Sequence, residues 1–327
     1  MADAVKKYER IAVEEGFTIP EIAQLQGRDI GAGREPSSFR QATFRALLDL
    51  GPDRIKTMDE DGIAMQVCVL AGNIVQDIDP VQGNELAALS NDRLAEAAKK
   101  FPGRITGLAA FAPRDPARAA AELERSVKRL GLKGGIVNSH SLGEYLDDRK
   151  FWPIFGAAEA LGVPVYLHPR EPHPDVLRRW FSGYPELALA SWGFAAETCT
   201  HYLRLMAAGL FDAHPKLTII LGHLGEGLPF WLARLDDHTR GAFAHRGLKR
   251  RSTDYLRDNT VITTSGNFYT PALLCSVMAM GVDNVIFSVD WPFESNKEAR
   301  QWLDSLPLSV EDKEKIAHKN AERVLKL

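Results

Sequence analysis

The stretch Leu217-Thr-Ile-Ile-Leu-Gly-His-Leu-Gly-Glu-Gly-Leu-Pro229 decides the fold class. It starts with an apolar run, passes through a glycine-rich turn and enters an amphipathic segment that begins at Leu228. An almost continuous apolar run is typical of a parallel strand that helices cover on both faces. The segment Val163–Leu167 has the same character. The sequence therefore favours an α/β fold built on a parallel sheet.

Short apolar runs alternate with amphipathic segments along the chain. We expect eight strands, at Ile11–Phe17, Met65–Ala71, Ile105–Phe111, Gly134–Asn138, Val163–His168, Thr218–Leu224, Val261–Ser265 and Asn284–Asp290. Apolar residues three and four positions apart predict helices at Val81–Phe101, Asp115–Leu130, Phe151–Leu161, Glu197–Ala213, Leu228–Phe243, Thr270–Met280, Glu298–Leu303 and Ser309–Leu327. Eight strands that alternate with helices predict a (β/α)8 TIM barrel rather than two doubly wound halves. Because there is no low-complexity linker and no internal repeat, we expect one domain over residues 1–327.

Two stretches interrupt the alternation, and we expect them to be long loops. Thr18–Asp61 follows the first strand and is polar, whereas Glu171–Ala190 follows the fifth strand and is rich in proline and aromatic residues. Both come after strand carboxyl ends, where barrel enzymes build the walls of their active sites. Each stretch either forms such a wall or is a surface segment with no role in the active site.

Composition excludes several classes of function. The 327-residue chain has 40 Lys and Arg against 43 Asp and Glu, a net charge of −3, whereas nucleic-acid binders usually carry a basic excess. Three scattered cysteines without a Cys-x-x-Cys motif indicate a reducing compartment. No apolar run reaches the roughly 18 residues of a spanning helix, and the first residues lack a signal-peptide core. We expect a cytoplasmic protein with no nucleic-acid or membrane partner.

Polar side chains gather where the apolar strands end. Such residues are Glu14 and Glu15 near the end of the first strand, His168 at the end of the fifth, His223 near the end of the sixth and Asp290 at the end of the eighth. Carboxylates and imidazoles at the ends of buried strands are costly unless they are paired or bind a metal. Taken singly, each could be structural: His168 as a satisfied core histidine, Asp290 as a turn former. We expect one of the two adjacent glutamates to be solvated. Together they indicate a divalent metal site.

Five segments resemble one known family. They are Val-Glu-Glu-Gly-Phe (13–17), Tyr-Leu-His-Pro-Arg (166–170), Ile-Ile-Leu-Gly-His-Leu-Gly-Glu-Gly-Leu-Pro (219–229), Ile-Thr-Thr-Ser-Gly-Asn-Phe (262–268) and Phe-Ser-Val-Asp-Trp-Pro-Phe-Glu (287–294). The chain is similar over almost its whole length to the aromatic-acid decarboxylases of the amidohydrolase superfamily. These are related to aminocarboxymuconate-semialdehyde decarboxylase and include the gamma-resorcylate and 2,3-dihydroxybenzoate decarboxylases. The resemblance implies an amidohydrolase-like barrel.

The resemblance also implies roles for individual residues. It gives metal ligands Glu14, His168 and Asp290, catalytic residues His223, Asp290 and Glu226, and substrate-binding residues Asn138, Arg234 and Phe293. Arg234 could equally be a helix or subunit-interface residue. The family's first-strand histidine is replaced here by Gly16, so one nitrogen ligand is missing. A set with two carboxylates and one imidazole favours Mn²⁺ or Mg²⁺ over Zn²⁺, although Zn²⁺ stays open.

The chemistry of this site favours one metal ion per subunit. A binuclear site of the superfamily would want a carboxylated lysine at the end of strand four, where the chain has Asn138, while Lys133 lies at the other end. We expect the enzyme, a carboxy-lyase, to decarboxylate an ortho-hydroxylated benzoate whose carboxylate and ortho oxygen both bind the metal. Trp291, Phe293 and Phe268 could line the ring pocket, although each could equally pack the barrel. We expect reversibility at high bicarbonate concentration, because no cofactor consumes the product.

Two other functions stay open at this point. A hydrolase would use His223 to deprotonate a metal-bound water that attacks a lactone, an amide or a carbon–carbon bond. A non-enzymatic barrel that has lost its metal would serve in assembly. The resemblance further implies a homodimer or homotetramer.

Overall fold

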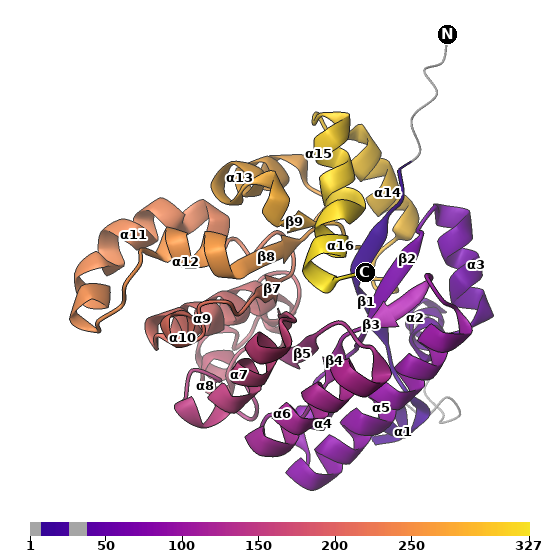
Figure 1. Cartoon of the computed structure of the whole chain (residues 1–327), viewed down its shortest axis with the longest axis horizontal. Coiled ribbons are helices and arrows are strands. Elements are labelled where there is room, and N and C mark those ends of the chain that lie inside the picture. Colours follow the sequence, from indigo (N-terminus) through magenta and orange to yellow (C-terminus); the bar gives the residue numbers. More distant parts are fainter. Residues whose placement is uncertain (1–7, 26–37) are drawn as a thin grey trace.

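The strands of the protein run parallel and in chain order in a computed structural model that describes residues 8–25 and 38–327 (Figure 1). They are β1 (Ile11–Phe17), β2 (Met65–Leu70), β3 (Ile105–Gly107), β4 (Ala109–Ala110), β5 (Gly135–Asn138), β6 (Val165–His168), β7 (Ile219–Leu221), β8 (Thr260–Thr263) and β9 (Val285–Ile286). Their ladders form a three-stranded sheet, β1 to β3, and a six-stranded sheet, β4 to β9. β3 and β4 together are the predicted strand Ile105–Phe111, which leaves β2 and joins β5 at Leu108: the Leu108 amide donates to Cys68 and the Ala109 amide to Gly134. Each of the eight predicted strands is therefore present.

Helices surround the strands (Figure 1). They are α1 (Pro20–Leu25), α2 (Ser38–Leu48), α3 (Pro52–Asp61), α4 (Ile74–Asp77), α5 (Pro80–Lys100), α6 (Pro116–Arg125), α7 (Trp152–Leu161), α8 (Pro174–Trp180), α9 (Gly193–Ala207), α10 (Leu210–Ala213), α11 (Leu228–His245), α12 (Ser252–Asn259), α13 (Thr270–Met280), α14 (Asn296–Ser305), α15 (Val310–Glu314) and α16 (Asn320–Leu325). Shorter helical turns are η1 (Ser126–Leu130), η2 (Arg149–Phe151), η3 (Pro185–Ala188), η4 (Val282–Asn284) and η5 (Lys315–Lys319). Several helices begin as their sequences predict: Asp79 and Asp115, each before a proline, accept hydrogen bonds from the first-turn amides of α5 and α6.

One cluster of buried side chains connects all the strands. Its members alternate along the strands, as side chains on one face of a strand do; they include Ile11, Val13, Val67, Val69, Leu108, Ile136, Tyr166, Ile220, Val261 and Ile286. A second, larger cluster packs the opposite faces of the strands against the helices. Because one cluster draws on every predicted strand, the parallel α/β fold of a TIM barrel is confirmed.

The junction between β9 and β1 differs from the others. No strand ladder joins these two strands within residues 8–25 and 38–327. Instead, the Gly16 amide donates to the Trp291 carbonyl at 2.6 Å, and the Glu15 side chain bonds to the chain that follows β9. The last strand and the first therefore meet through isolated contacts close to Asp290.

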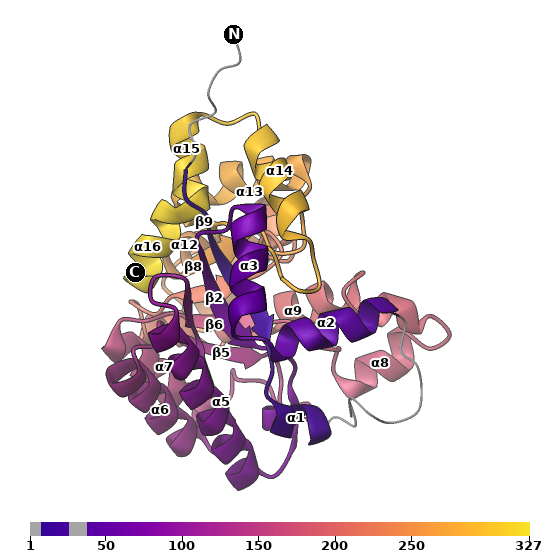
Figure 2. The ribbon, with the colours of Figure 1, turned by 90° about the vertical axis from the view of Figure 1, so that its right-hand side faces the viewer.

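The two stretches expected as loops contain helices. Thr18–Asp61 includes α1, α2 and α3, while residues 26–37 lie outside the described part of the chain. Glu171–Ala190 includes α8 and η3, and Figure 2 shows α2 and α8 extending on the same side of the molecule. These insertions contain helices because prolines at Pro20, Pro52 and Pro174 start helices and do not interrupt them.

Other boundaries also differ from the prediction. α12 was not predicted, and the helix expected at Glu197–Ala213 is broken at Gly209, which has a left-handed φ of 85°. Among the described helices, none is both long and apolar enough to cross a membrane.

Candidate active site

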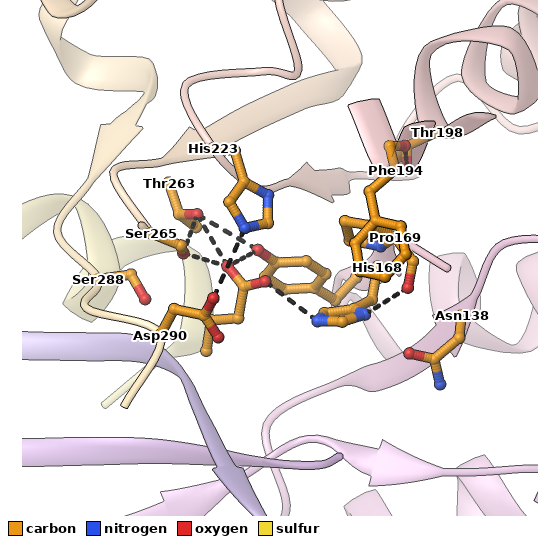
Figure 3. Close-up of polar contacts among 12 residues, drawn as sticks. Asn138, His168, Pro169, Phe194, Thr198, His223, Thr263, Ser265, Ser288 and Asp290 are labelled. Carbon is orange, nitrogen blue, oxygen red and sulfur yellow. Dashed lines mark hydrogen bonds and ion pairs between the residues drawn. The ribbon is translucent and has the colours of Figure 1, made fainter. Parts of the chain in front are cut away.

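Four side chains from four different strands converge at one end of the barrel, and Figure 3 shows three of them, His168, His223 and Asp290, close together. Glu14 comes from β1, His168 ends β6, His223 follows β7 and Asp290 follows β9. Glu14 Oε1 lies 3.3 Å from His168 Nε2, and His223 Nε2 lies 3.8 Å from Asp290 Oδ2. The sequence-predicted ligands and the predicted proton-handling histidine thus form one group.

Both adjacent glutamates are buried, so the expectation that one of them is solvated was wrong. Glu14 is 1% exposed and Glu15 is 0% exposed. The pairing of β1 with β2 shifts between Val13 and Glu15, which places an irregularity at Glu14. Such a bulge changes which way successive side chains point and is common beside active sites. Both carboxylates therefore point into the protein interior, where they contact different partners.

The two oxygens of Glu14 have different surroundings. Oε2 accepts hydrogen bonds from the hydroxyls of Tyr166, Ser265 and Thr263, whereas Oε1 is buried and accepts none. A Cβ at Gly222 would lie 2.7 Å from the Tyr166 hydroxyl and 3.2 Å from Glu14 Oε2, so glycine leaves room for this arrangement. Burial raises the pKa of Glu14, but the nearby charges of His223 and His168 outweigh it and lower the pKa. Oε1 is consequently an ionised oxygen with free lone pairs.

His168 presents one nitrogen to Glu14 and uses the other locally. Its Nδ1 donates to the Pro169 carbonyl at 2.8 Å, because a carbonyl can only accept. This bond orients the ring and leaves Nε2 facing Glu14 Oε1. Burial lowers the pKa of His168, but the Glu14 carboxylate overcomes this and the pKa is raised.

His223 lies between two carboxylates, those of Glu226 and Asp290. His223 Nδ1 lies 2.8 Å from Glu226 Oε1, while Nε2 faces Asp290. All three residues have left-handed backbones, with φ of 50°, 56° and 76°, which are unfavourable for residues other than glycine. Burial lowers the pKa of His223, but Glu226 and Glu14 raise it well above the usual value. Burial raises the pKa of Asp290, against the opposing effect of His223.

The donor set fits a divalent metal. Within residues 8–25 and 38–327, no three His, Cys, Asp or Glu side chains already stand as a closed metal cage. However, Glu14 Oε1 is a buried oxygen that accepts no hydrogen bond, and it faces a histidine nitrogen whose ring is held from the other side. Asp290 lies close enough to both groups for their charges to alter its pKa. Two carboxylates and an imidazole are ligands suited to a hard or borderline divalent cation.

The predicted substrate-binding residues are more dispersed. Asn138 pairs with His168 across β5 and β6, and its amide nitrogen donates to the Gly72 carbonyl. Phe293 is 46% exposed, next to Gly16. Arg234 lies on α11 and lines a cavity of about 360 Å³ together with Glu226 and Trp231. The structure therefore brings Asn138 beside His168, whereas Arg234 lies apart from the four converging side chains.

Of the three aromatic residues that could line a ring pocket, two have packing partners. Trp291 lies under the Arg54 guanidinium, 4.3 Å from the ring centroid, and Phe268 packs against Trp302. Phe293 is therefore the candidate with the most free surface.

Sequence reasoning missed the residues that support the candidate ligands. These are Tyr166, Thr263 and Ser265 around Glu14, and Glu15 and Arg54 beside Asp290. One signal was available for Tyr166, which precedes His168 by two positions and so shares its face of β6. No local pattern singles out Arg54, because its guanidinium contacts residues that are distant in sequence or main-chain atoms.

Replacing Gly16 with histidine is expected to destabilise the protein without increasing its affinity for Zn²⁺. A Cβ at Gly16 would lie 2.9 Å from Leu47 Cδ2 and 3.4 Å from the Trp291 carbonyl oxygen, so the place of the missing ligand is already filled. We expect Gly16→His to cost about 1–3 kcal/mol of unfolding free energy. Thermal unfolding and a Zn²⁺ competition titration measure both effects. Tighter Zn²⁺ binding at unchanged stability would contradict this explanation of the glycine.

Comparison with known proteins reveals close relatives. The sequence model of the family described as Amidohydrolase matches residues 61–327. The chain is 41% identical to gamma-resorcylate decarboxylase of Rhizobium radiobacter, over 97% of this chain and 98% of that protein.

Two solved structures are similar as well. One is 2,6-dihydroxybenzoate decarboxylase complexed with 2,6-dihydroxybenzoate, at 40% identity and a TM-score of 0.90 over 98% of this chain and 100% of the other. The second is dihydroxybenzoic acid decarboxylase from Polaromonas sp. JS666 with bound manganese and the inhibitor 2-nitroresorcinol. It is 39% identical, with a TM-score of 0.90, over 98% of this chain and 97% of the other.

Proposed function

The chain belongs to the amidohydrolase family, and we propose that Glu14, His168 and Asp290 hold the divalent metal of its active site. The protein is a metal-dependent decarboxylase of hydroxylated benzoates, a carboxy-lyase. The observation that carries the ligand assignment is the buried Glu14 Oε1, which accepts no hydrogen bond and pairs only with His168 Nε2, at 3.3 Å. Manganese in a similar structure agrees with the expected preference for Mn²⁺ or Mg²⁺.

When bound, the divalent cation supplies Lewis-acid stabilisation of negative charge on substrate oxygens. The side chains supply the proton. Decarboxylation of an aromatic acid needs a proton on the ring carbon that bears the carboxylate. The electron pair of the breaking carbon–carbon bond then returns to the ring, and CO₂ leaves. We assign the proton delivery to Asp290 Oδ2, whose pKa burial raises.

His223 and Glu226 are proposed to restore that proton. His223 Nε2 faces Asp290 Oδ2, and Glu226 holds the ring through Nδ1. Glu226 and Glu14 raise the pKa of His223, which favours the protonated imidazole next to the carboxylate that needs a proton. Because no step consumes CO₂ or the phenol, we propose that the reaction is reversible at high bicarbonate concentration.

The finer proposal for the substrate is a benzoate with a hydroxyl group ortho to the carboxylate. The relative acts on gamma-resorcylate and the similar structure holds 2,6-dihydroxybenzoate, as their names state. Asn138, beside His168, and the half-exposed Phe293 are proposed to contact the ring substituents and the ring face. We also propose that Arg234 binds substrate, because the cavity that it lines is also lined by Glu226.

The ligand assignment is tested by metal content. We expect about one equivalent of Mn²⁺ per chain in the wild type and less than about a tenth in Glu14→Gln and in His168→Ala. Glu122→Gln is the matched control, because Glu122 is a buried carboxylate that bonds to Asn91, Arg125 and Ser126 on the outer helices. Full Mn²⁺ retention by both ligand variants would contradict the assignment.

A homodimer or homotetramer is proposed from the exposed apolar surface. Trp180, Tyr184, Trp192, Phe230 and Trp231 are each at least half exposed, and Trp192 and Trp231 line the same cavity as Arg234. Exposed aromatic groups that lie close together, as Trp192, Trp231 and Phe230 do, are typical of subunit contacts. Light scattering is expected to show an oligomer for the wild type and a smaller species for Trp231→Glu; a monomeric wild type would refute the proposal.

A cytoplasmic location of the protein stays a prediction.

A further inference from the structure

Glu15 bonds to the chain on both sides of Asp290. Its Oε1 accepts hydrogen bonds from the Val289 amide at 3.0 Å and the Ser288 hydroxyl at 3.2 Å. Its Oε2 accepts from the Trp291 amide at 2.9 Å. The carboxylate is fully buried, so no water competes for these three donors. One side chain of β1 therefore holds the residues immediately before and after Asp290.

The backbone at Asp290 needs such support. Its φ of 76° is left-handed, a conformation that residues with a Cβ adopt rarely and only when their surroundings impose it. β9 ends at Ile286, four residues earlier, and no ladder joins it to β1 within the described part of the chain. The main-chain amides of Val289 and Trp291 thus donate hydrogen bonds to the Glu15 carboxylate and not to the main chain of a neighbouring strand.

Arg54 completes this corner of the barrel. It is fully buried, and its guanidinium donates to the Gly16 carbonyl and to Gln66 Oε1. The same group lies 4.3 Å from the centroid of the Trp291 ring. Arg54 therefore fixes the residue after Glu15 and the residue after Asp290, and it places a positive charge near the Glu15 carboxylate.

We propose that Glu15, supported by Arg54, is a positioning residue that sets the left-handed turn at Asp290 and thereby aims its carboxylate at His223 and at the metal ligands. This inference rests on the proposed role of Asp290. Glu15 touches neither substrate nor metal; it acts through the main chain on each side of Asp290. Accordingly, Glu15→Ala is expected to be damaging, contrary to what a solvated glutamate would predict.

Glu15→Gln tests the proposal with little change in shape. The glutamine oxygen can accept from one of the two amides, but its NH₂ group faces the other amide and cannot accept. We expect the dissociation constant for Mn²⁺ to rise about tenfold and kcat to fall about 10–100-fold, the range for groups that orient ligands. Glu122→Gln controls for the loss of a buried carboxylate and is expected to change neither quantity.

A double-mutant cycle separates positioning from general damage. Glu15→Gln is expected to have no further effect on Mn²⁺ affinity in an Asp290→Ala background, because that background has no ligand oxygen at position 290 to aim. The same loss of affinity in both backgrounds, or wild-type Mn²⁺ affinity and kcat in Glu15→Gln, would overturn the proposal. If Glu15→Gln does not fold, the cycle is run with Arg54→Lys, for which the same non-additivity is expected and additivity overturns the proposal. Mn²⁺ affinity is read by electron paramagnetic resonance, so the result stands even if the wild type decarboxylates no hydroxybenzoate.

Discussion

Replacing Asp290 with asparagine is expected to lower kcat for decarboxylation by about three orders of magnitude. Asparagine keeps the shape of the side chain but can neither deliver a proton nor contribute a negative charge to the metal. The backbone contacts that Glu15 makes to Val289 and Trp291 do not involve the Asp290 side chain, so the folded structure should persist. Steady-state turnover of a hydroxybenzoate, measured at saturating Mn²⁺, gives the effect.

A matched aspartate variant controls for the lost charge. Asp212 lies on α10 and accepts hydrogen bonds from the Tyr255 hydroxyl and the Lys249 amide, and it is not among the converging side chains. Asp212→Asn should keep kcat within about twofold, since surface and peripheral substitutions have small effects. Equal kcat values for Asp290→Asn and the wild type would remove Asp290 from the mechanism.

His223→Asn is expected to lower kcat by about two to three orders of magnitude while the protein retains its metal. The imidazole faces Asp290 through Nε2, so its loss removes the group that restores the proton, whereas Glu14 and His168 remain in place. Glu226→Gln should act in the same direction and less strongly, because it weakens the bond to Nδ1 without removing the ring. Turnover and Mn²⁺ content of the same preparations distinguish these effects.

The control for this histidine is His214, which has the same kind of carboxylate partner. His214 Nδ1 lies 3.0 Å from Glu159 Oε2, next to α10 and outside the group of four. His214→Asn should leave kcat unchanged. A His223→Asn variant that loses its metal in parallel with its activity would instead make His223 a ligand.

The barrel and the four converging side chains could be predicted from the sequence because each signal is local. The alternation of apolar residues in a strand, an Asp-Pro helix start and a polar residue that ends an apolar run each involve residues only a few positions apart. Thus His168, His223 and Asp290 could be assigned to strand ends, and parallel order brings those ends together. Helices such as α1 and α8 were missed because prolines that start helices resemble loop residues in sequence.

The support of the ligands could not be predicted, since it depends on contacts between distant segments. Glu15 bonds to residues more than 270 positions away, and the shift in pairing within β1 that buries it beside Glu14 has no marker in the sequence. Arg54 lies in a stretch that the sequence predicts as a polar loop, yet it is fully buried, with its guanidinium over the Trp291 ring. Gly16 shows the same limit: the missing histidine is visible in the sequence, but the Leu47 side chain that fills its place is not.

The most direct test of the central claim is the reaction itself. Purified protein stripped of metal is incubated with 2,6-dihydroxybenzoate, with and without Mn²⁺, while CO₂ and the dihydroxybenzene product are quantified. We expect equal amounts of both products with Mn²⁺, and none in the metal-free sample or after addition of a chelator. Absence of decarboxylation across 2,6-, 2,3- and other hydroxybenzoates, combined with Mn²⁺-dependent hydrolysis of lactones, would contradict the account.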